Sequence, residues 1–370
     1  MSAAAPADPL TIFFVDPGYA EYSGDAILVC TPDGGYYLVD GGDAGTDPPW
    51  DCGEARVLPL LDSLGAVSLD GIVATHPHSD HVGGLTRVIE TLPVGRVWDS
   101  GWPYSPTPAY TEFLQAVESA AVPYSVVRRG DILDWGPSLT VEVLHPVEPL
   151  DPDNMNNTSI VLRVTYQEVS FLLEGDVYTE GGESLIIQAW EAGEIPSLAA
   201  DVLKVAHHGS SSSTSASWLA AVDPEWAAIE VGDGNPYGHP HGEVISRLLA
   251  WGVQIFRTDL EGTFYISTDG CDLYHNSLPP SGGAPEGHLT AYPSPALEYV
   301  RFDWPEDAQP TAFAVYNMLG EEIFEEEPGA PPLEWDLSLE GGSRASPGLY
   351  AAVLDLVDGN RWTEYFAISR

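Results

Sequence analysis

The stretch "ATHPHSDHVGGL", residues 74–85, places three histidines and one aspartate within six positions. It follows an apolar run that is typical of a buried strand, and a pair of glycines closes it. Imidazole nitrogens and carboxylate oxygens are the ligands that zinc accepts in catalytic sites. The spacing lets His76 and His78 reach one metal ion, while Asp80 and His81 turn toward a second ion nearby.

Further ligands are expected at other strand ends, because four ligands from one tight loop cannot close a site for two metals. The run "SFLLEGD" ends in Asp176, which is placed to bridge the two ions. The run "DVLKVAHHGS" ends in His207 and His208. Of this pair we favour His207 as the metal ligand and His208 as a catalytic or substrate contact. The sequence is also compatible with the reverse assignment.

The chain is strongly acidic, with 56 Asp and Glu against 13 Lys and Arg and a net charge of −43. The acidity is spread along all 370 residues, and Lys204 is the only lysine. This composition indicates a surface adapted to high salt, where ions screen the self-repulsion, and hence a saline habitat. It also argues against tight nonspecific binding to nucleic acid at low ionic strength.

Other features exclude several classes of protein. The three cysteines, Cys30, Cys52 and Cys271, are widely spaced and form neither a zinc knuckle nor a recognisable disulfide framework. No run of apolar residues is long enough to span a bilayer. The first ten residues lack a basic region followed by an apolar core, so no signal peptide is visible.

The pattern of apolar residues predicts a layered domain over residues 1–275. Strands are expected at 11–16, 25–30 and 36–40, a helix at 54–65, and a strand at 71–75 that leads into the histidine cluster. Strands and helices then alternate in a second series that begins near residue 138. Two such halves indicate an α/β or layered α+β domain.

The final part of the chain differs in composition and in its pattern of apolar residues. Residues 276–296 are dense in Pro, Gly and Ser and are interpreted as a linker. Residues 297–370 hold short β-rich runs at regular spacing with turn residues between them. This pattern predicts a small all-β sandwich.

Three motifs together, "THPHSDHVGGL", "FLLEGD" and "KVAHHGS", resemble the metallo-β-lactamase fold superfamily. The runs "GDAILV", "YYLVDGG", "LHP", "NNTSIVL" and "NPYGHPH" are similar to the hydrolase domain of ComEC-type DNA-uptake proteins. The resemblance covers roughly residues 11–268. It implies an α+β fold, a four-layer αββα sandwich, with two Zn²⁺ ions at one edge and Mn²⁺ as the alternative metal.

One departure from the family pattern concerns the first metal. Many members supply a further histidine just before the strand that leads to the Gly-Asp pair, and "NMNNTSIVL" stands in that place. Asn156 or Asn157 would then act as a ligand or a substrate contact, unless His145 folds back from upstream. The resemblance therefore implies a first metal with one protein nitrogen fewer than usual.

Two metals of this kind generate a hydroxide at neutral pH, and Asp80 would orient it and accept its proton. Ser210 and Ser211 precede a predicted helix, where hydroxyl and N–H groups suit an anion. His239 and His241 stand on a turn before another helix and would donate to phosphate oxygens. The leading hypothesis is a secreted zinc-dependent phosphodiesterase, with an extracellular nuclease acting on DNA as one form of it.

Two other hypotheses stay open. The same hydroxide attacks a carbonyl in a β-lactamase or a lactonase, and every metal ligand would be shared. The third hypothesis is a non-catalytic surface binding protein on a retired hydrolase scaffold, which the intact set of ligand residues disfavours.

The runs "AVYNMLGEEI" and "SPGLYAAVLDL" near the end resemble the small Ig-like domains related to FlgD and to bacterial secretion-sorting tails. This resemblance implies an exported enzyme, secreted or held at the cell surface. Its final domain would then contact the surface or the secretion machinery.

Overall fold

A computed structural model describes residues 9–18, 24–46, 49–277, 290–292, 299–304, 308–317, 322–326, 328–329, 331–339, 344–345, 348–357 and 361–368. The chain divides into two compact units. Unit 1 comprises Met1–Leu260 and Phe264–His275, and unit 2 comprises Glu261–Thr263 and Asn276–Arg370.

The first sheet of unit 1 has eight strands in the order β17-β16-β1-β2-β3-β6-β7-β8. Strands β16, β1, β2 and β3 pair antiparallel, and β3, β6, β7 and β8 pair parallel. The bounds are β1 Leu10–Phe14, β2 Ile27–Cys30, β3 Tyr36–Val39, β6 Gly71–Ala74, β7 Val97–Asp99, β8 Tyr124–Val126, β16 Phe264–Thr268 and β17 Leu273–Ser277.

The second sheet of unit 1 has seven strands in the order β15-β14-β13-β12-β11-β10-β9. Strands β9 to β12 pair antiparallel, and β12 to β15 pair parallel. The bounds are β9 Ile132–Leu133, β10 Leu139–His145, β11 Val161–Tyr166, β12 Val169–Leu173, β13 Val202–Lys204, β14 Trp226–Ile229 and β15 Gln254–Arg257. A separate hairpin joins β4 Ala44–Thr46 to β5 Pro49–Asp51.

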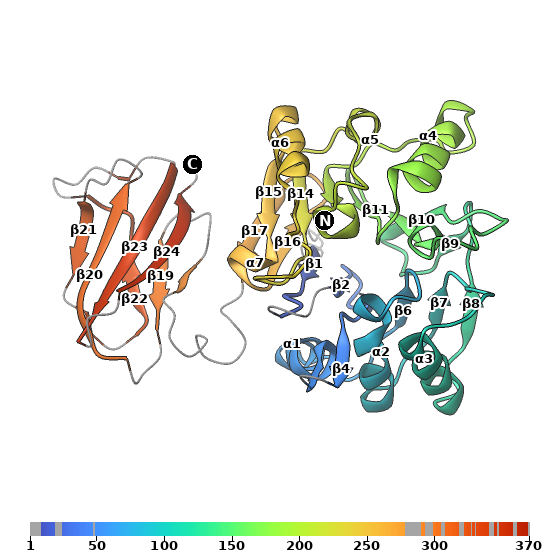
Figure 1. Ribbon diagram of the computed structural model, residues 1–370, viewed down its shortest axis with the longest axis horizontal. Coiled ribbons are helices and arrows are strands. Elements are labelled where there is room, and N and C mark those ends of the chain that lie inside the picture. Colours follow the sequence, from blue (N-terminus) through green and yellow to red (C-terminus); the bar gives the residue numbers. More distant parts are fainter. Residues whose placement is uncertain are drawn as a thin grey trace, which may run out of the picture. The chain divides into compact units, whose positions relative to one another are not determined.

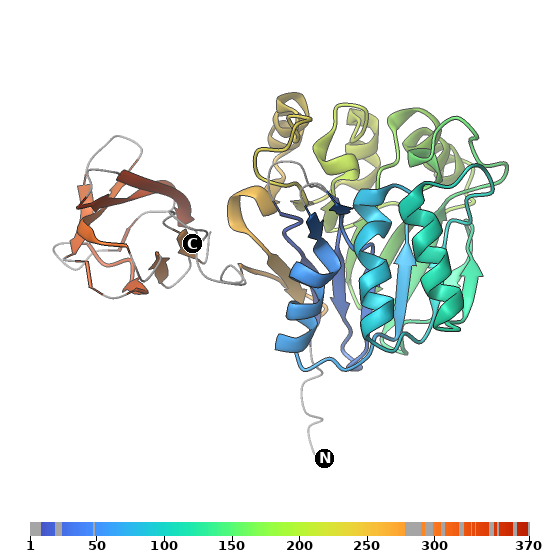
Figure 2. The ribbon, with the colours of Figure 1, turned by 60° about the horizontal axis from the view of Figure 1, so that its bottom comes forward.

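Helices cover the outer faces of both sheets, so unit 1 is a four-layer αββα sandwich. Figure 1 shows α1, α2 and α3 along one side, α4, α5 and α6 along the other, and the strands between; Figure 2 shows the same layers after a turn. The helices are α1 Leu58–Ser63, α2 Ser79–Thr91, α3 Pro108–Ser119, α4 Ser184–Glu191, α5 Ala216–Val222, α6 Gly242–Trp251 and α7 Thr258–Glu261. Shorter helical turns are η1 Gly53–Val57, η2 Asn156–Thr158, η3 Thr179–Glu183 and η4 Ala206–Gly209. The predicted α+β class is confirmed.

Apolar side chains fill the space between the two sheets. Phe14 and Val29 of the first sheet and Val141 and Phe171 of the second belong to one buried cluster. A second cluster lies between the second sheet and its helices and includes Trp218 of α5. Burial of this apolar area is the main force that fixes the sheets against one another. The loops at the strand ends are therefore carried on rigid elements.

Unit 2 consists of two β-sheets around its own apolar core. One sheet holds β18 Thr290–Tyr292, β19 Val300–Asp303 and β22 Leu333–Trp335; the other holds β20 Pro310–Asn317, β21 Glu322–Glu326, β23 Gly348–Leu356 and β24 Arg361–Ile368. Phe302, Phe313 and Leu354 are buried between them. Strand β18 lies inside the predicted linker, most of which falls outside the described residues. The Ig-like assignment and the sorting role stay predictions.

Within the described residues, none of the helices is long and apolar enough to cross a membrane.

Candidate metal centre

The histidine cluster lies where β6 of the first sheet passes into α2. His76 and His78 occupy the connecting turn, whereas Asp80 and His81 belong to the first turn of α2. This differs from the expected single loop, because the helix begins at Ser79, before the last two candidate ligands. The carboxylate of Asp80 is favourable there, since a helix N-terminus carries partial positive charge.

The second sheet contributes Asp176, just beyond β12, and the pair in η4, just beyond β13. His207 and His208 both have positive φ values, 53° and 54°. Such a backbone conformation is costly for non-glycine residues and is commonly found at functional sites. A hydrogen bond from the His207 backbone N–H to the Gly175 carbonyl, 3.0 Å, holds this turn beside Asp176.

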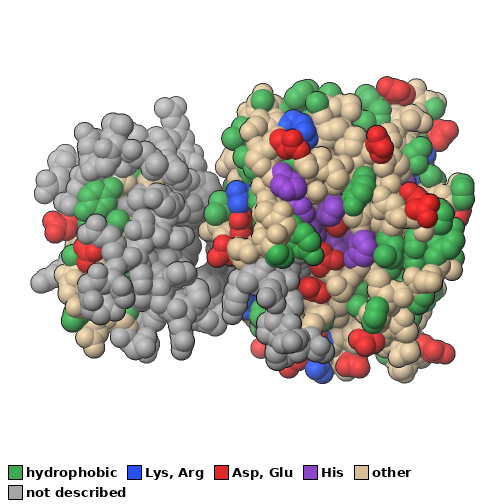
Figure 3. Space-filling model, in the orientation of Figure 1, with side chains coloured by type: hydrophobic (Ala, Val, Ile, Leu, Met, Phe, Trp, Pro, Cys, Tyr) green, Lys and Arg blue, Asp and Glu red, His purple; other side chains and the backbone are tan. Residues whose placement is uncertain are grey.

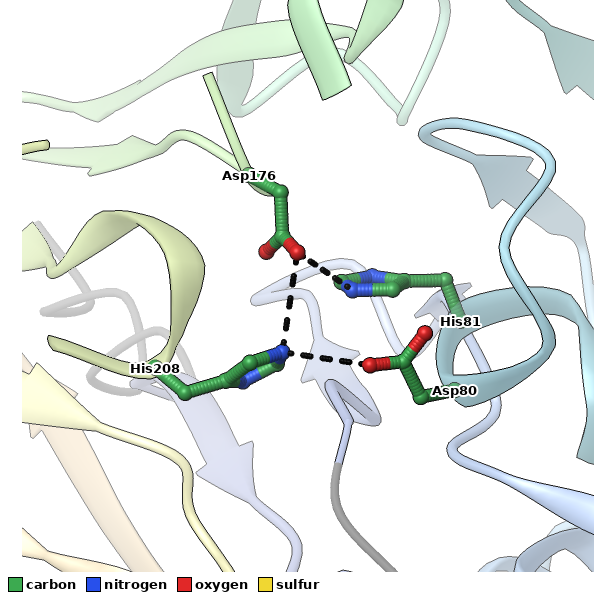
Figure 4. Close-up of side chains that lie close together, drawn as sticks. All are labelled: Asp80, His81, Asp176 and His208. Carbon is green, nitrogen blue, oxygen red and sulfur yellow. Dashed lines mark ion pairs between the residues drawn. The ribbon is translucent and has the colours of Figure 1, made fainter. Parts of the chain in front are cut away.

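Four imidazoles surround one oxygen of Asp176. The distances from its Oδ2 to Nε2 are 3.3 Å for His81, 3.7 Å for His208, 3.8 Å for His207 and 3.9 Å for His76. Figure 4 shows Asp176 pointing between His81 and His208, with Asp80 beside His208 at 3.5 Å. Loops distant in sequence therefore converge on one point, as the motif spacing predicts.

The charges at this point suit a bound cation. The ligand atoms of Asp80, His81, Asp176 and His208 all lie within 4.8 Å of one another. His81 Nε2, His208 Nε2 and Asp176 Oδ1 are buried, and none has a hydrogen-bond partner among the described residues. Burial alone would lower the pKa of His81, but the carboxylates of Asp176 and Asp40 raise it well above its ordinary value. A divalent ion would satisfy the same carboxylates and occupy the unpartnered atoms, so the donor set fits a metal.

The other nitrogen of each imidazole is held by a neighbour. His81 Nδ1 lies 2.7 Å from Asp40 Oδ2, and His208 Nδ1 lies 3.0 Å from the Glu230 carbonyl. His207 Nδ1 contacts the Ser212 hydroxyl at 3.0 Å. Such partners fix the ring orientation and the tautomer of metal-binding histidines. They leave each Nε2 directed toward Asp176.

A buried ion pair lies beneath His208 and joins the two sheets. Lys204, at the end of β13, donates from Nζ to Asp25 Oδ2 at 2.7 Å, and Asp25 Oδ1 lies 3.2 Å from His208 Nδ1. Lys204 is 0% exposed. Glu230 Oε2 lies 4.0 Å from the same ammonium. Burial and the nearby Asp25 raise the pKa of Glu230 well above its ordinary value.

The structure separates the three candidates for the missing ligand. Asn156 lines the same cavity as His78, and its Oδ1 is buried without a hydrogen-bond partner among the described residues. The Nδ1 of His78 lies 2.9 Å from His76 Nε2. Asn157 points elsewhere: its amide donates to the Glu180 carbonyl and accepts from the Tyr178 N–H. His145 Nε2 bonds the Asn157 carbonyl at 2.8 Å.

Neither His145 nor Asn157 lines the cavity around Asp176, and loop contacts use His145 Nε2 and the side-chain amide of Asn157. Asn156 is the candidate that reaches the site. The group of four potential ligands includes His208 rather than His207, so the geometry favours His208 for that position, the reverse of the preference drawn from the sequence.

A cavity of about 720 Å³ opens onto the candidate centre. Its lining is drawn from the β4 region, the starts of α2 and α3, and the loop before α6: Asp43, Ala44, Gly45, His78, Ser79, Asp80, Thr107, Pro108, Ala109, Glu112, Asn156, Asp176, His207, His208, Tyr237 and His239. None of these lining residues is Lys or Arg. Figure 3 shows histidines gathered on this face of unit 1.

The cavity includes two of the five predicted substrate contacts, Asn156 and His239. Ser210, Ser211 and His241 do not line it. The Ser211 N–H donates to His241 Nδ1 at 2.9 Å, and the Ser210 hydroxyl is bonded within the serine loop. Sequence reasoning missed Tyr237, although it stands between the two histidines and the start of "NPYGHPH".

Comparison with known proteins assigns the layered fold of unit 1 to a family. Residues 20–229, more than half of the chain, match the model of the metallo-beta-lactamase superfamily. The chain belongs to this superfamily.

Two curated relatives share about a third of their aligned residues with the chain. ComE operon protein 3 of Bacillus subtilis is 33% identical over 251 residues, which is 65% of this chain and 31% of that protein. Competence protein ComA of Neisseria gonorrhoeae is 33% identical over 209 residues, 56% of this chain and 27% of that protein. The chain therefore matches about a third or less of the length of these relatives.

Among solved structures, a variant of the CmlA beta-hydroxylase aligns with a TM-score of 0.43 at 16% identity. The alignment covers 72% of this chain and 55% of that one.

Proposed function

We propose that the chain is a metal-dependent hydrolase of phosphodiesters that works with two divalent ions, zinc or manganese. The observation that carries this proposal is the ring of four imidazole nitrogens around Asp176 Oδ2. His76 and His78, with Asn156, would hold one ion, Asp80, His81 and His208 the other, and Asp176 would lie between them. When bound, such ions supply a nucleophile near neutral pH and offset negative charge on the substrate.

The side chains of the cavity would place the substrate and the attacking water. Asp80 lines the cavity and is about a quarter exposed, so its carboxylate is accessible to water that enters. We assign it the task of orienting that water and accepting its proton. His239 lines the same cavity on the opposite loop and is placed to donate a hydrogen bond to a phosphate oxygen.

The charge of the loaded site favours an anionic substrate over a neutral lactam or lactone. On binding, two divalent ions would bring four positive charges to the three carboxylates of Asp40, Asp80 and Asp176, and Lys204 offsets Asp25. Asp43 and Glu112, which also line the cavity, would offset part of that positive charge. An electropositive centre of this kind stabilises a phosphodiester and its developing charge. Several motifs resemble those of ComEC-type DNA-uptake proteins, and the relative from Neisseria gonorrhoeae is named a competence protein. This name supports a nucleotide-based substrate.

The direct test is hydrolysis of bis(p-nitrophenyl) phosphate by protein that is loaded with zinc or with manganese. Single- and double-stranded DNA and a chromogenic cephalosporin are assayed in parallel, across a range of salt concentrations. We expect turnover of the diester that disappears in His76→Ala and after treatment with a chelator.

Two results would contradict the proposal. Turnover of the cephalosporin with none of any phosphodiester would assign the site to carbonyl substrates. Protein that folds without chelator but binds far less than one metal ion per chain would revive the hypothesis of a binding protein on a retired scaffold.

We also propose that unit 2 is an attachment or sorting module and that the enzyme works outside the cell in a saline setting. The support is the resemblance of its sequence to secretion-sorting domains and the acidic composition. Fractionation of host cultures, with detection of the full chain by antibody, tests the location. Retention of the whole population inside the cells would count against it.

A further inference from the structure

We infer that the rim of the cavity carries a stacking subsite for one flat aromatic group of the substrate, formed by Tyr237 and His239. The preferred phosphodiester would then carry an unpaired nucleobase, as in a small nucleotide or the end of a single strand. This inference rests on the proposed function and deepens it, because it names the substrate class.

A row of rings leads from the cavity mouth to the candidate metal centre. Tyr237 is 66% exposed, although it lines the cavity. Its ring stacks on His239 with centroids 5.7 Å apart and planes at 24°. His239 in turn meets His207 edge-on at 5.6 Å, and His207 Nε2 lies 3.8 Å from Asp176 Oδ2. Tyr237 is thus joined to the centre by two ring contacts, so it stands ready for an aromatic group attached to a phosphate bound there.

The loop that carries Tyr237 is braced rather than loose. Asn235 bonds both backbone groups of His239: its Nδ2 donates to the carbonyl at 2.7 Å, and its Oδ1 accepts from the N–H at 3.0 Å. The same Nδ2 lies 3.1 Å from the Gly232 carbonyl. Because the loop is already ordered, stacking on Tyr237 would cost little conformational entropy.

The charges around the cavity exclude the usual way of holding a nucleic-acid backbone. Among the residues that the structure describes, no Lys or Arg lines the cavity, while Asp43 and Glu112 do. Proteins that track along a phosphate chain rely on cationic side chains, and this chain has a net charge of −43. Affinity beyond the scissile phosphate must then come from uncharged contacts. Stacking of a base on an aromatic side chain is such a contact and tolerates any base.

A base pair inside a duplex is stacked on both faces by its neighbours and cannot lie against Tyr237. The substrate class is therefore narrower than nucleic acid in general. It comprises diesters with an exposed base. The subsite favours substrates that carry such a base and does not distinguish one base from another.

The experiment compares two competitive inhibitors, thymidine 5′-monophosphate and methyl phosphate, which share the phosphate, whereas the thymidine compound adds a sugar and the aromatic base. Their inhibition constants are measured against hydrolysis of bis(p-nitrophenyl) phosphate by metal-loaded full-length protein. Tyr237→Ala should raise the inhibition constant of thymidine 5′-monophosphate about tenfold, an order of magnitude that stacking supplies. The inhibition constant of methyl phosphate should stay unchanged. Tyr237→Phe should behave as the wild type.

The matched control is Tyr274→Ala, which removes another half-exposed tyrosine that does not line the cavity. If the wild type hydrolyses the diester but Tyr237→Ala leaves the ratio of the two constants unchanged, the subsite is overturned and the phosphodiesterase proposal stands. An equal change in Tyr274→Ala would also overturn it. If the wild type hydrolyses no diester, the proposed function and the subsite fail together.

Discussion

At the scale of single residues, Asp176 is the side chain on which the centre depends most. Its Oδ2 lies within 3.9 Å of four imidazole nitrogens, so replacing one oxygen by an uncharged NH₂ group removes the charge that unites them. We expect Asp176→Asn to lose bound metal and to lower turnover by more than the roughly 10–100-fold typical of residues that only support ligands. Elemental analysis and the diester assay measure both effects.

Asp62→Asn is the matched control for that change, because Asp62 is exposed on α1 and removed from the cavity. It should leave metal content and turnover as in the wild type. Full metal occupancy in Asp176→Asn would show that the imidazoles hold the ions without a bridging carboxylate.

Truncation of two neighbouring asparagines should have different effects, one on metal binding and the other on stability. Asn156 lines the cavity with His78 and has a buried Oδ1 without a hydrogen-bond partner among the described residues, so Asn156→Ala should weaken binding of the metal that His76 and His78 would hold. Asn157 binds the loop around Glu180, so Asn157→Ala should instead lower the free energy of unfolding by about 1–3 kcal/mol, as expected for buried groups left unpaired. Chelator titration and urea denaturation separate the two effects. Loss of metal in Asn157→Ala alone would reverse the assignment.

The local pattern of residues explains which parts of the site the sequence reveals. His76, His78, Asp80 and His81 stand within six positions, so their spacing alone predicts a metal site. The Lys204 to Asp25 pair could not be found in this way, because 179 positions separate its members and the two sheets bring them together. The sequence also could not decide between Asn156 and Asn157. That choice depends on which of the two side chains hydrogen-bonds to backbone groups of a distant loop.

At the scale of elements, the position of α2 depends on the absence of a side chain at Gly84. A Cβ there would lie 2.1 Å from the Gly41 carbonyl oxygen and 2.5 Å from the Gly53 nitrogen. Because both contacts are with backbone, Gly84→Ala must displace the helix that carries Asp80 and His81. We expect a loss of about 1–3 kcal/mol or more in the free energy of unfolding, typical of overpacking, together with weaker metal binding.

The control for the helix is Gly242→Ala at the start of α6, where a Cβ would meet nothing within 4 Å. Alanine is the better helix former, so this variant should be neutral or slightly more stable. Equal denaturation midpoints for the two variants would contradict the close approach of α2 to the neighbouring loops.

The ion pair between β13 and the segment before β2 should contribute strongly to stability when only one partner is removed. Lys204→Met leaves Asp25 buried without its cation, and such changes typically cost about 3–5 kcal/mol. The double variant with Asp25→Asn should regain part of this loss. Arg87→Met, which breaks exposed pairs with Glu54 and Glu90, should cost about 1 kcal/mol or less. Urea denaturation of the four proteins measures the differences, and equal losses for Lys204→Met and Arg87→Met would contradict a buried, uncompensated charge.

At the scale of the whole molecule, the net charge of −43 should make stability depend on salt. Raising NaCl from 0.1 M to 1 M shortens the screening length from about 10 Å to about 3 Å, which weakens the repulsion between carboxylates in the folded state. The melting temperature should therefore rise with NaCl and rise less with sucrose of equal osmolality. A melting temperature that stays constant or falls with NaCl would contradict a surface adapted to salt.

The layered architecture could be predicted because strands and helices alternate along the chain in two series. The closure of the first sheet could not, since β16 pairs with β1 across most of the sequence of unit 1. Local patterns of apolar residues show that a strand forms but carry no information about its distant partner. For the same reason the sequence indicated a boundary near residue 275 but not that residues 261–263 would group with unit 2.

The burial of the single lysine has a practical consequence. Reagents that acylate amines, such as succinimidyl dyes and many cross-linkers, find no accessible lysine on the folded chain. Lys204 becomes reactive only when β13 opens from its neighbours. The rate of acylation of Lys204, followed by mass spectrometry, would therefore report the rate at which the interior beneath the candidate metal centre opens.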